Sequence, residues 1–516
     1  MSNYLLFLAF IFSYGVYRLI TTTIESRKLA NLAEERGCKP EKRFDSGFLG
    51  LSRFRLVMKH AKAGTVIQFI TARFQEKKTW SVNLFGKRVL GTCESENIKA
   101  MLAMQFEEFA LEYRKVDFNP LLGDGIFNSD GKVWHHSRAL LRPQFSRTQI
   151  SDLDALEVHV QRFMKLIPTD GTEIDIQDLI YRLTIDSATE FLFGKCTEAL
   201  LSDDGNASLK YGDYSFARAF SEAQEWCIWR LRLGVLSPIA WLIPSYSASN
   251  KAVHKIMDRL IASCLAEMKH NPQSLAEKEY NPTDGRYIFL HALAHDTQDP
   301  RFLKDQLLNI LLAGRDTTAV LITWTLFSLA RNPDIYRKIR KEILTHFGTG
   351  TEKISFESLK NCTYLRYTLQ ETLRLFPPVP INSRLAIRNT TLPRGGGPDE
   401  SAPVIVPKGQ LIHYYPYELH RRKEVFGPDA EEFLPDRWDP SHPSYRKIGG
   451  WDYVPFNGGP RICLGQQFAL TEAGYVVARL VQRIGELGME DKREPVFAPN
   501  MTMPSARPVM MSFREA

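Results

Sequence analysis

The N-terminal segment contains the first long apolar run of the chain. Residues Tyr4–Ile24 carry a single charge, Arg18, over 21 positions, which is long enough to cross a hydrocarbon core of about 30 Å. Basic residues follow the run and none precedes it, so the rest of the chain is expected to face the cytosol. A cleaved signal peptide would need a basic start and a small-residue cleavage site, and both are missing. We expect residues 1–24 to form a membrane anchor; the alternative is an apolar helix packed on the domain.

A second apolar run, Phe302–Arg331, predicts the longest buried helix and ends at Asn332-Pro333. Gly314 and the sequence Asp316-Thr317-Thr318 interrupt its Leu/Ile/Ala pattern. Such residues weaken a helix and bury polar groups, so we expect the helix to bend there and to host chemistry. The alternative is that the threonines bond back to the helix and merely kink it.

Alternating patterns predict a small β part. Thr79–Leu84 and Lys87–Thr92 alternate around Phe85-Gly86, which is typical of a hairpin. Val404–Tyr415 predicts a strand interrupted near Pro407, whereas the three glycines in Thr390–Gly397 favour an irregular surface loop. Lys39–Phe54 is polar and weakly patterned, and we expect residues 25–54 to form a linker. The remainder, residues 55–516, is expected to be mainly α.

Composition limits the classes of function. The length of 516 residues suggests about three domains, but the motifs below spread over most of the chain and favour one. The excess of 66 Lys and Arg over 59 Asp and Glu is mild, and no basic run with aromatics indicates nucleic-acid binding. A membrane surface or an acidic partner fits better. The seven cysteines are scattered without a Cys-x-x-Cys pair, which argues against a disulfide framework or a zinc site.

Cys463 is a candidate metal ligand. It precedes an amphipathic run, Gln466–Arg483, and a helix N-terminus favours a thiolate. Gly458 and Gly459 allow a backbone to wrap closely around sulfur, and Arg461 places a cation beside it. The alternative is a buried structural cysteine in a glycine-rich turn.

Two pairs of residues have helical spacing. Trp134 and Arg138 are four residues apart, so the indole N–H and the guanidinium can reach one acceptor. Surface cation–π packing is the alternative. Glu371 and Arg374 are three residues apart, and Arg437 supplies a second cation later in the chain. The alternative for these is a solvated surface pair.

The segment from Phe456 to Gly465 resembles the haem-binding signature of the cytochromes P-450, matched at Phe456, Gly459, Arg461, Cys463 and Gly465. The resemblance implies the cytochrome P-450 fold and haem iron on a Cys463 thiolate. It implies an oxygen-binding groove at Ala313–Thr318, where Asp316 and Thr317 relay protons. It also implies that Trp134, Arg138 and Arg384 hold haem propionates, and that Glu371, Arg374 and Arg437 form a buried structural triad.

A narrower resemblance concerns Pro380–Arg384, Leu392–Gly397 and Asn457–Glu472, which are similar to the fungal n-alkane and fatty-acid hydroxylase family. This implies hydroxylation of long aliphatic chains at the terminal carbon, with electrons from NADPH through NADPH-cytochrome P-450 reductase, in the endoplasmic reticulum membrane. Some related animal enzymes carry a haem-esterifying glutamate where this chain has Ala313, so haem b is expected to be non-covalent apart from the Cys463 bond.

Three alternatives stay open. The runner-up is a monooxygenase of aromatic, xenobiotic or secondary-metabolite substrates. A haem-thiolate isomerase or dehydratase would need no reductase, and a non-catalytic haem sensor would need no proton relay. The aromatic-rich segment Tyr211–Ile243 could roof an apolar cavity, dip into a bilayer surface or form core, and Arg230 or Arg232 could bind a fatty-acid carboxylate.

Overall fold

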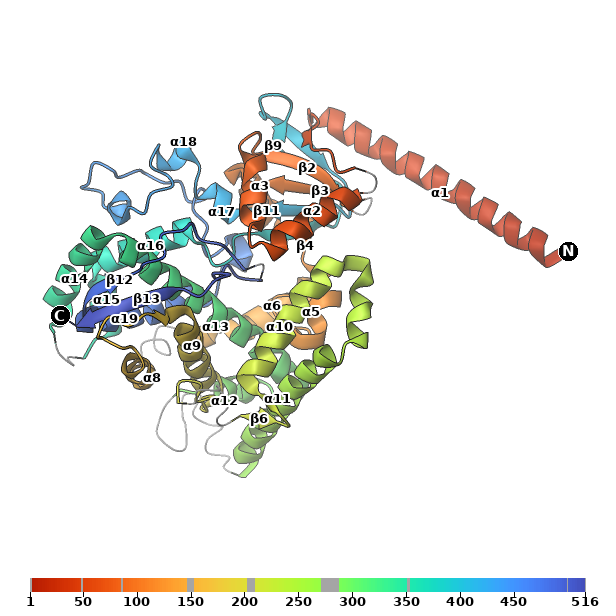
Figure 1. Cartoon of the computed structure of the whole chain (residues 1–516). Helices are drawn as coiled ribbons and strands as arrows, with labels where there is room; N and C mark the ends of the chain where they lie inside the picture. The colour runs from red at the N-terminus through yellow and green to blue at the C-terminus, as the bar shows by residue number, and fades with distance from the viewer. Residues whose placement is uncertain are drawn as a thin grey trace.

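A computed structural model describes residues 2–47, 50–84, 87–145, 153–201, 209–270, 287–349, 353–498 and 500–515. The fold is mainly helical, with small sheets, as the sequence predicted (Figure 1). The helices are α1 (Ser2–Glu35), α2 (Leu51–Lys62), α3 (Val66–Phe74), α4 (Ser95–Lys99), α5 (Lys115–Leu122), α6 (Gly131–Leu141), α8 (Asp154–Lys165), α9 (Ile176–Phe193), α10 (Phe216–Leu233), α11 (Pro244–His270), α12 (Phe289–Asp296), α13 (Pro300–Arg331), α14 (Pro333–Phe347), α15 (Phe356–Asn361), α16 (Thr363–Leu375), α17 (Pro416–Leu419), α18 (Lys423–Phe426) and α19 (Gln466–Arg483).

The strands form one larger sheet and several small ones. They are β1 (Lys42–Arg43), β2 (Thr79–Leu84), β3 (Lys87–Thr92), β4 (Phe109–Ala110), β5 (Ile174–Asp175), β6 (Lys210–Tyr211), β7 (Tyr214–Ser215), β8 (Asn382–Ala386), β9 (Thr390–Gly396), β10 (Ala402–Val406), β11 (Leu411–Tyr414), β12 (Ile484–Gly488) and β13 (Met510–Glu515). The order of the larger sheet is β1-β2-β3-β11-β8-β4, and β9 pairs with β10, β6 with β7, and β13 with both β12 and β5. The antiparallel pairing of β2 with β3 confirms the predicted hairpin, although Phe85 and Gly86 lie outside the described residues.

One sequence interpretation was wrong. Residues Thr390–Gly396, expected as an irregular loop, form strand β9, which pairs antiparallel with β10. The glycines are needed because the backbone is crowded: a Cβ on Gly395 would lie 2.4 Å from Cβ of Thr79, and one on Gly396 would lie 2.5 Å from the Lys39 carbonyl oxygen. Close backbone approach, rather than loop flexibility, explains these glycines.

Helix α13 connects the two main hydrophobic cores of the protein. Its N-terminal half, from Leu303 to Leu311, packs with α10, α11 and α12, and its C-terminal half, from Ala319 to Ala330, packs with α9, α16 and α19. The side chain of Asp299 caps its start by accepting a hydrogen bond from the Arg301 amide. Its length and apolar composition would also suit a bilayer, but it is mostly buried in the protein. The polar segment predicted to carry chemistry lies between the two cores.

The N-terminal helix extends away from the rest of the protein (Figure 1). It runs without interruption from Ser2 to Glu35. Residues beyond it join the sheet: Lys39 donates its amide to the Pro403 carbonyl, and β1 pairs with β2. The segment 25–54 therefore contains helix and sheet where the sequence predicted a linker. The boundary between an anchor and a catalytic domain stays a prediction.

Candidate active site

The cysteine loop, residues Phe456–Gly465, contains a short 3-10 turn, Gly459–Arg461, and leads into α19. The amide of Cys463 donates a hydrogen bond to the Phe456 carbonyl at 3.0 Å, which closes the loop. Gly459 has a positive φ of 65°, and a Cβ there would lie 1.9 Å from the Leu102 carbonyl oxygen, so only glycine fits. Asn457 also has a positive φ, and its side chain accepts a hydrogen bond from the Tyr414 hydroxyl at 2.9 Å.

The electrostatics of Cys463 correct one expectation. The backbone of Gly465 and the charge of Arg138 both lower the pKa of the thiol, as the helix N-terminus argument predicted. Desolvation by the atoms around the sulfur has the larger effect, however, and raises the pKa of the thiol above its ordinary value, although the Cys463 side chain is exposed.

A cluster of arginines lies beside the loop. Arg461 donates to the Asp130 carboxylate at 2.6 Å and to the Ser129 carbonyl at 3.0 Å, and its guanidinium lies 4.3 Å from the centre of the Trp134 ring. Arg138 donates to the carbonyl of Ile462 at 3.0 Å. Trp134 and Arg138 thus come from one helix, α6, but the guanidinium stacked closest to the indole is that of Arg461.

This cluster carries more positive charge than its carboxylate neutralises. Burial lowers the pKa of Arg461 to about 10; Asp130 opposes this, while the charges of Arg384, Arg114 and Arg138 lower it further. Arg384 is buried on β8 and donates to the carbonyl of its neighbour Ser383. Guanidiniums that outnumber the neighbouring carboxylate suit an anionic group, such as the carboxylates of a porphyrin.

Helix α13 presents an open face in its middle. Leu312, Ala313, Gly314 and Thr317 are partly exposed although most positions on either side are buried. A Cβ on Gly314 would meet no atom within 4 Å. Because α13 packs against α19, the helix that begins after Cys463, this open face and the exposed Cys463 belong to the same region. An accessible thiol and an accessible core helix fit a large flat cofactor.

The two polar residues predicted for proton transfer point to different partners. Thr317 donates its hydroxyl to the Ala313 carbonyl at 2.6 Å, the back-bonded arrangement that the sequence left open as an alternative. Asp316 is buried and accepts a hydrogen bond from Gln224 of α10. Arg315 lies 3.6 Å from the Asp316 carboxylate and donates to the Ser221 hydroxyl. The sequence analysis did not predict the roles of Gln224 and Arg315. Gln224 is a polar residue on the mostly apolar buried face of α10, and this was the signal that could have indicated it.

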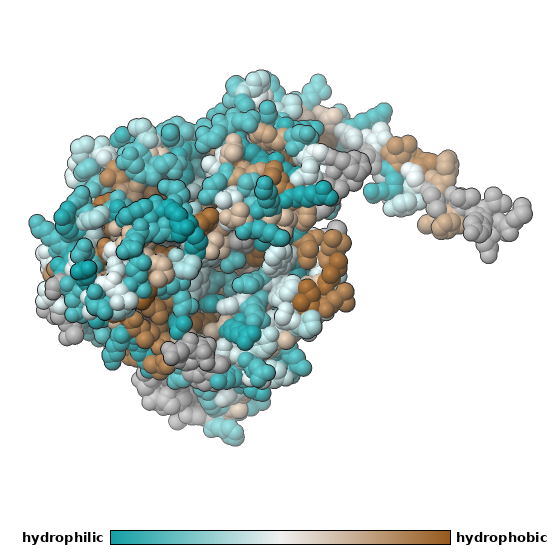
Figure 2. Space-filling model, viewed as in Figure 1, coloured by the Kyte–Doolittle hydropathy of each residue, from teal (hydrophilic) through white to brown (hydrophobic). Residues whose placement is uncertain are grey.

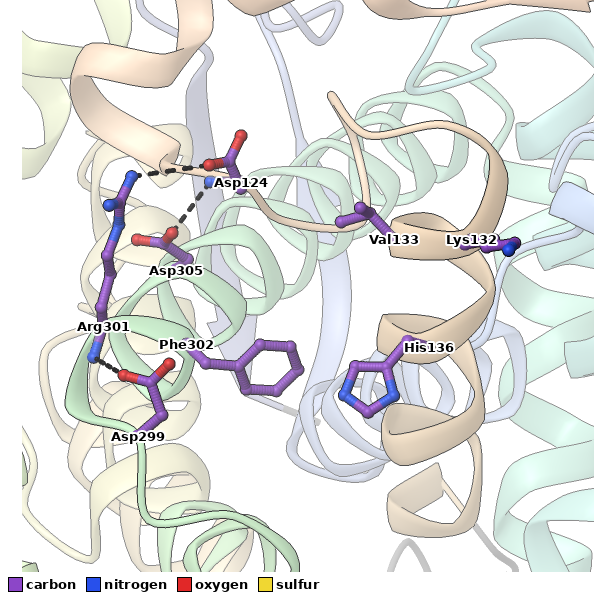
Figure 3. Close-up of a pocket in the computed structure, with 8 residues that line it drawn as sticks. All are labelled: Asp124, Lys132, Val133, His136, Asp299, Arg301, Phe302 and Asp305. Atoms are coloured by element: carbon purple, nitrogen blue, oxygen red, sulfur yellow. Dashed lines mark hydrogen bonds and ion pairs between the residues drawn. The ribbon is translucent and has the colours of Figure 1, made fainter.

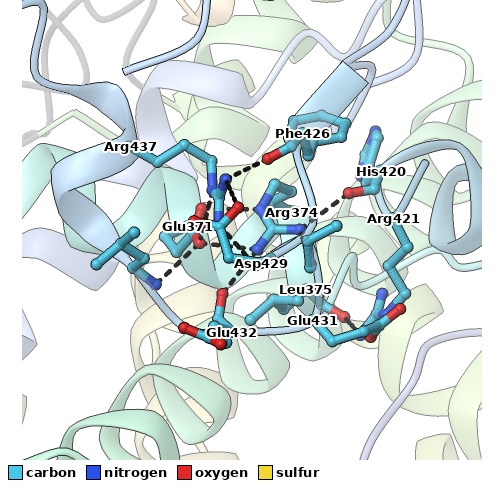
Figure 4. Close-up of polar contacts among 12 residues, drawn as sticks. Glu371, Arg374, Leu375, His420, Arg421, Phe426, Asp429, Glu431, Glu432 and Arg437 are labelled. Atoms are coloured by element: carbon cyan, nitrogen blue, oxygen red, sulfur yellow. Dashed lines mark hydrogen bonds and ion pairs between the residues drawn. The ribbon is translucent and has the colours of Figure 1, made fainter. Parts of the chain in front are cut away.

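Glu371, Arg374 and Arg437 meet in one fully buried network (Figure 4). Arg374 binds the Glu371 carboxylate through two N–H groups at 2.8 and 2.9 Å, and Nε of Arg437 lies 3.4 Å from it. The Trp438 indole and the Leu434 amide also donate to this carboxylate. The arginines donate in turn to backbone carbonyls, including those of His420, Ala430, Glu432, Phe426 and Asp429. The network therefore ties α16 to the segment that leads into the cysteine loop.

A pocket of about 390 Å³ lies at the N-terminal end of α13 (Figure 3). His136 of α6 and Phe302 of α13 face each other across it with ring centres 5.5 Å apart. Asp124, Asp299, Arg301 and Asp305 lie on the same side as Phe302, and Lys132 and Val133 lie with His136. None of the predicted site residues lines this pocket, which separates it from the chemistry at Cys463.

Comparison with known proteins identifies the family. The family model described as Cytochrome P450 matches residues 50–508. Cytochrome P450 52A12 of Debaryomyces hansenii is 44% identical over 508 residues, covering 96% of this chain and 94% of its own. Cytochrome P450 52A3-B of Candida maltosa is 45% identical, covering 87% and 86%, and Cytochrome P450 52A10 of the same yeast is 46% identical, covering 89% of each. The chain therefore belongs to the cytochrome P450 family and is a cytochrome P450 monooxygenase.

Proposed function

We propose that the protein hydroxylates long-chain aliphatic substrates, n-alkanes or fatty acids, at the terminal carbon. O₂ is the oxidant and NADPH supplies electrons through NADPH-cytochrome P-450 reductase. The observation that carries the proposal is the open face of α13 at Ala313 and Gly314, where the residues are small and a Cβ on Gly314 would meet no atom within 4 Å, so an extended chain can lie there. The fungal relatives support the same substrate class through the resemblance found in the sequence.

Haem b is proposed as the cofactor, with Cys463 as the axial ligand. The bound iron supplies oxygen activation, for which a thiolate ligand is suited. Arg461, Arg138, Arg384 and the Trp134 indole would hold the two propionates, since their cationic excess needs anionic partners. Phe456 and Gly459 shape the loop around the sulfur. Ala313 has no group that could esterify the haem, so the bond through Cys463 would be the single covalent link.

Proton delivery is assigned to Asp316 and Thr317. The Thr317 hydroxyl lies on the open face of α13, while Asp316 is next to it in the chain and buried towards α10. For the relay to operate, the Thr317 hydroxyl must leave its bond to Ala313 and donate towards the open face. The apolar residues of this face exclude water and position the substrate carbon.

Association with the endoplasmic reticulum membrane is part of the proposal. Helix α1 carries exposed apolar side chains from Phe7 to Ile24, and Leu236, Ile239, Trp241 and Leu242 between α10 and α11 are exposed as well. Figure 2 shows the latter as a hydrophobic area on the side of the molecule from which α1 extends. An anchor together with an apolar surface patch suits a bilayer with the catalytic domain on the cytosolic side.

The deciding experiment uses the reconstituted enzyme with reductase, NADPH and O₂. Alkanes and fatty acids of graded length are compared with aromatic compounds for binding and for product. Terminal alcohols from aliphatic chains, with little product from aromatics, are expected. Products from aromatic compounds alone would favour the alternative substrate class, and turnover without NADPH would favour an isomerase or a dehydratase.

A further inference from the structure

A group of metal-ligand side chains lies away from the cysteine loop, where α14 meets the start of α16. One carboxylate oxygen of Glu342, one ring nitrogen of His346 and the sulfur of Cys362 all lie within 4.8 Å of one another. Cys362 ends α15 and begins α16, while Glu342 and His346 are one turn apart on α14. The three helices lie together on the side of the molecule opposite α1 (Figure 1).

We propose that Glu342, His346 and Cys362 bind a divalent zinc-type cation. Thiolate, imidazole and carboxylate are the ligand types that zinc prefers, and a water molecule would complete four-fold coordination. This site could not be predicted from the sequence because the ligands come from two separate segments, with a single cysteine among them.

The surrounding hydrogen bonds already orient the ligands. The amides of Tyr364 and Leu365 donate to the Glu342 carboxylate at 2.9 and 3.1 Å, which holds it in place. The Nδ1 atom of His346 lies 3.0 Å from the Glu342 carbonyl. A carbonyl can only accept, so this nitrogen carries the proton and Nε2 keeps its lone pair for a metal.

The thiol of Cys362 already contacts the carboxylate that would share the metal with it. It donates to the Glu342 carboxylate at 3.2 Å and is fully buried. On binding, the S–H bond breaks, a sulfur–metal bond forms and the proton leaves to solvent, so charge and atoms balance. In tetrahedral zinc sites ligand atoms lie roughly 3.3–3.8 Å apart, by the usual bond lengths. The exposed His346 side chain can provide the small movement that is needed and the path of entry.

The structural alternative is that Glu342 merely caps α16, with the thiol as one more donor. The two readings differ in what they predict for added metal. If the group only caps the helix, zinc will bind no better to this protein than to a variant without the thiol. If the group is a metal site, the thiolate must bond to the metal directly.

The test uses the full-length haem-loaded enzyme, purified without a histidine tag and treated with a chelator. Zn²⁺ binding is measured by metal analysis after dialysis, and Cd²⁺ is added as a spectroscopic probe for sulfur–metal charge transfer in difference spectra. We expect one equivalent of either metal and a charge-transfer band. Cys362→Ser should abolish the band, and His346→Ala should weaken binding at least tenfold.

Matched controls are Cys38→Ser and His270→Ala, which change a thiol and an exposed imidazole elsewhere. Both should bind metal as the unchanged protein does. Haem content reports correct folding of every variant, so a loss of metal with full haem content cannot be attributed to unfolding. Absence of the charge-transfer band in the unchanged protein, or its persistence in Cys362→Ser, would overturn the proposal. Any metal bound would then be adventitious. These readouts need no turnover and are independent of the substrate class.

Discussion

Gln224 of α10 donates a hydrogen bond from its side-chain amide to the carboxylate of Asp316 on α13. Both residues are buried, and neither Oε1 of Gln224 nor Oδ1 of Asp316 has a hydrogen-bond partner. Buried polar atoms without partners are costly, so this contact lies in a region where a water molecule or a movement of α10 can change the pairing. The bond therefore connects the helix that covers α13 to the residue assigned to proton delivery.

Replacing Gln224 tests that connection. In Gln224→Met the carboxylate of Asp316 loses its donor on α10 and is held by Arg315 alone. We expect the amount of hydroxylated product per NADPH consumed to fall several-fold, with a matching rise in hydrogen peroxide, because misplaced protons release reduced oxygen unused. Ser221→Ala, which removes the partner of Arg315 on the same helix, is the control and should change coupling less. Unchanged coupling in Gln224→Met would show that the contact is structural.

Asp316→Asn tests the carboxylate itself. The amide keeps the size of the side chain but cannot carry a proton, so product formation is expected to fall about 10²-fold, the range typical of general acid–base catalysis. Haem content and the position of the ferrous carbon monoxide band should not change, since Asp316 does not contact the cysteine loop. An active Asp316→Asn enzyme with an ordinary solvent isotope effect would remove Asp316 from the relay.

Glu371→Ala is expected to abolish haem retention. The substitution leaves Arg374 and Arg437 buried without a carboxylate, which costs about 3–5 kcal/mol for a broken buried pair. The measurement is the ratio of haem to protein after purification. Glu431→Ala removes the exposed partner of Arg421 nearby and should keep its haem. A Glu371→Ala protein that keeps its haem and only turns over slowly would contradict the structural role.

Glu472 predicts a pH dependence of stability. It is buried on α19, and burial raises the pKa of its carboxyl from 4.5 to about 7, although Ser187 and Thr318 lower it. The folded protein then holds a proton that the unfolded chain has released, so the contribution of Glu472 to stability falls as the pH rises from about 4.5 to 7. Glu472→Gln stays neutral and should be more stable than the unchanged protein at pH 8, by about 3 kcal/mol at most.

The measurement is thermal unfolding at pH 8 and at pH 5. The advantage of Glu472→Gln should shrink at the lower pH, where the natural carboxyl is protonated in the folded state. Glu490→Gln, an exposed substitution, serves as the control and should follow the unchanged protein at both values. An equal effect of Glu472→Gln at both pH values would show that the carboxyl is not neutral in the folded protein.

The sequence predicted local features better than distant contacts. Glu371 and Arg374 could be paired from their spacing because a helix places such residues on one face. The bond between Gln224 and Asp316 joins residues 92 positions apart, and it depends on how α10 packs over α13, which no local pattern reports.

Two further differences have the same origin. The glycines near Gly395 read as a loop because the approach of Thr79, from a distant segment, is not visible in the sequence. The helix N-terminus at Cys463 was predicted correctly as an influence that lowers the pKa of the thiol, but the larger effect of desolvation, which raises that pKa, follows from the tertiary structure. Local sequence rules thus predicted the direction of each separate effect, such as the lowering of the thiol pKa by the helix N-terminus, but not which effect is the largest.

The uninterrupted helix α1 sets the distance between its apolar segment and the sheet. With residues 4–24 inserted in a bilayer, the remaining 11 residues to Glu35 form a rigid stalk of about 16 Å at the helical rise of 1.5 Å per residue. The Lys39 amide donates a hydrogen bond to the Pro403 carbonyl soon after the helix ends, so the connection between this stalk and the sheet is short. The catalytic domain would be held at a set height and tilt above the lipid headgroups, and inserting a few flexible residues after Glu35 would release both.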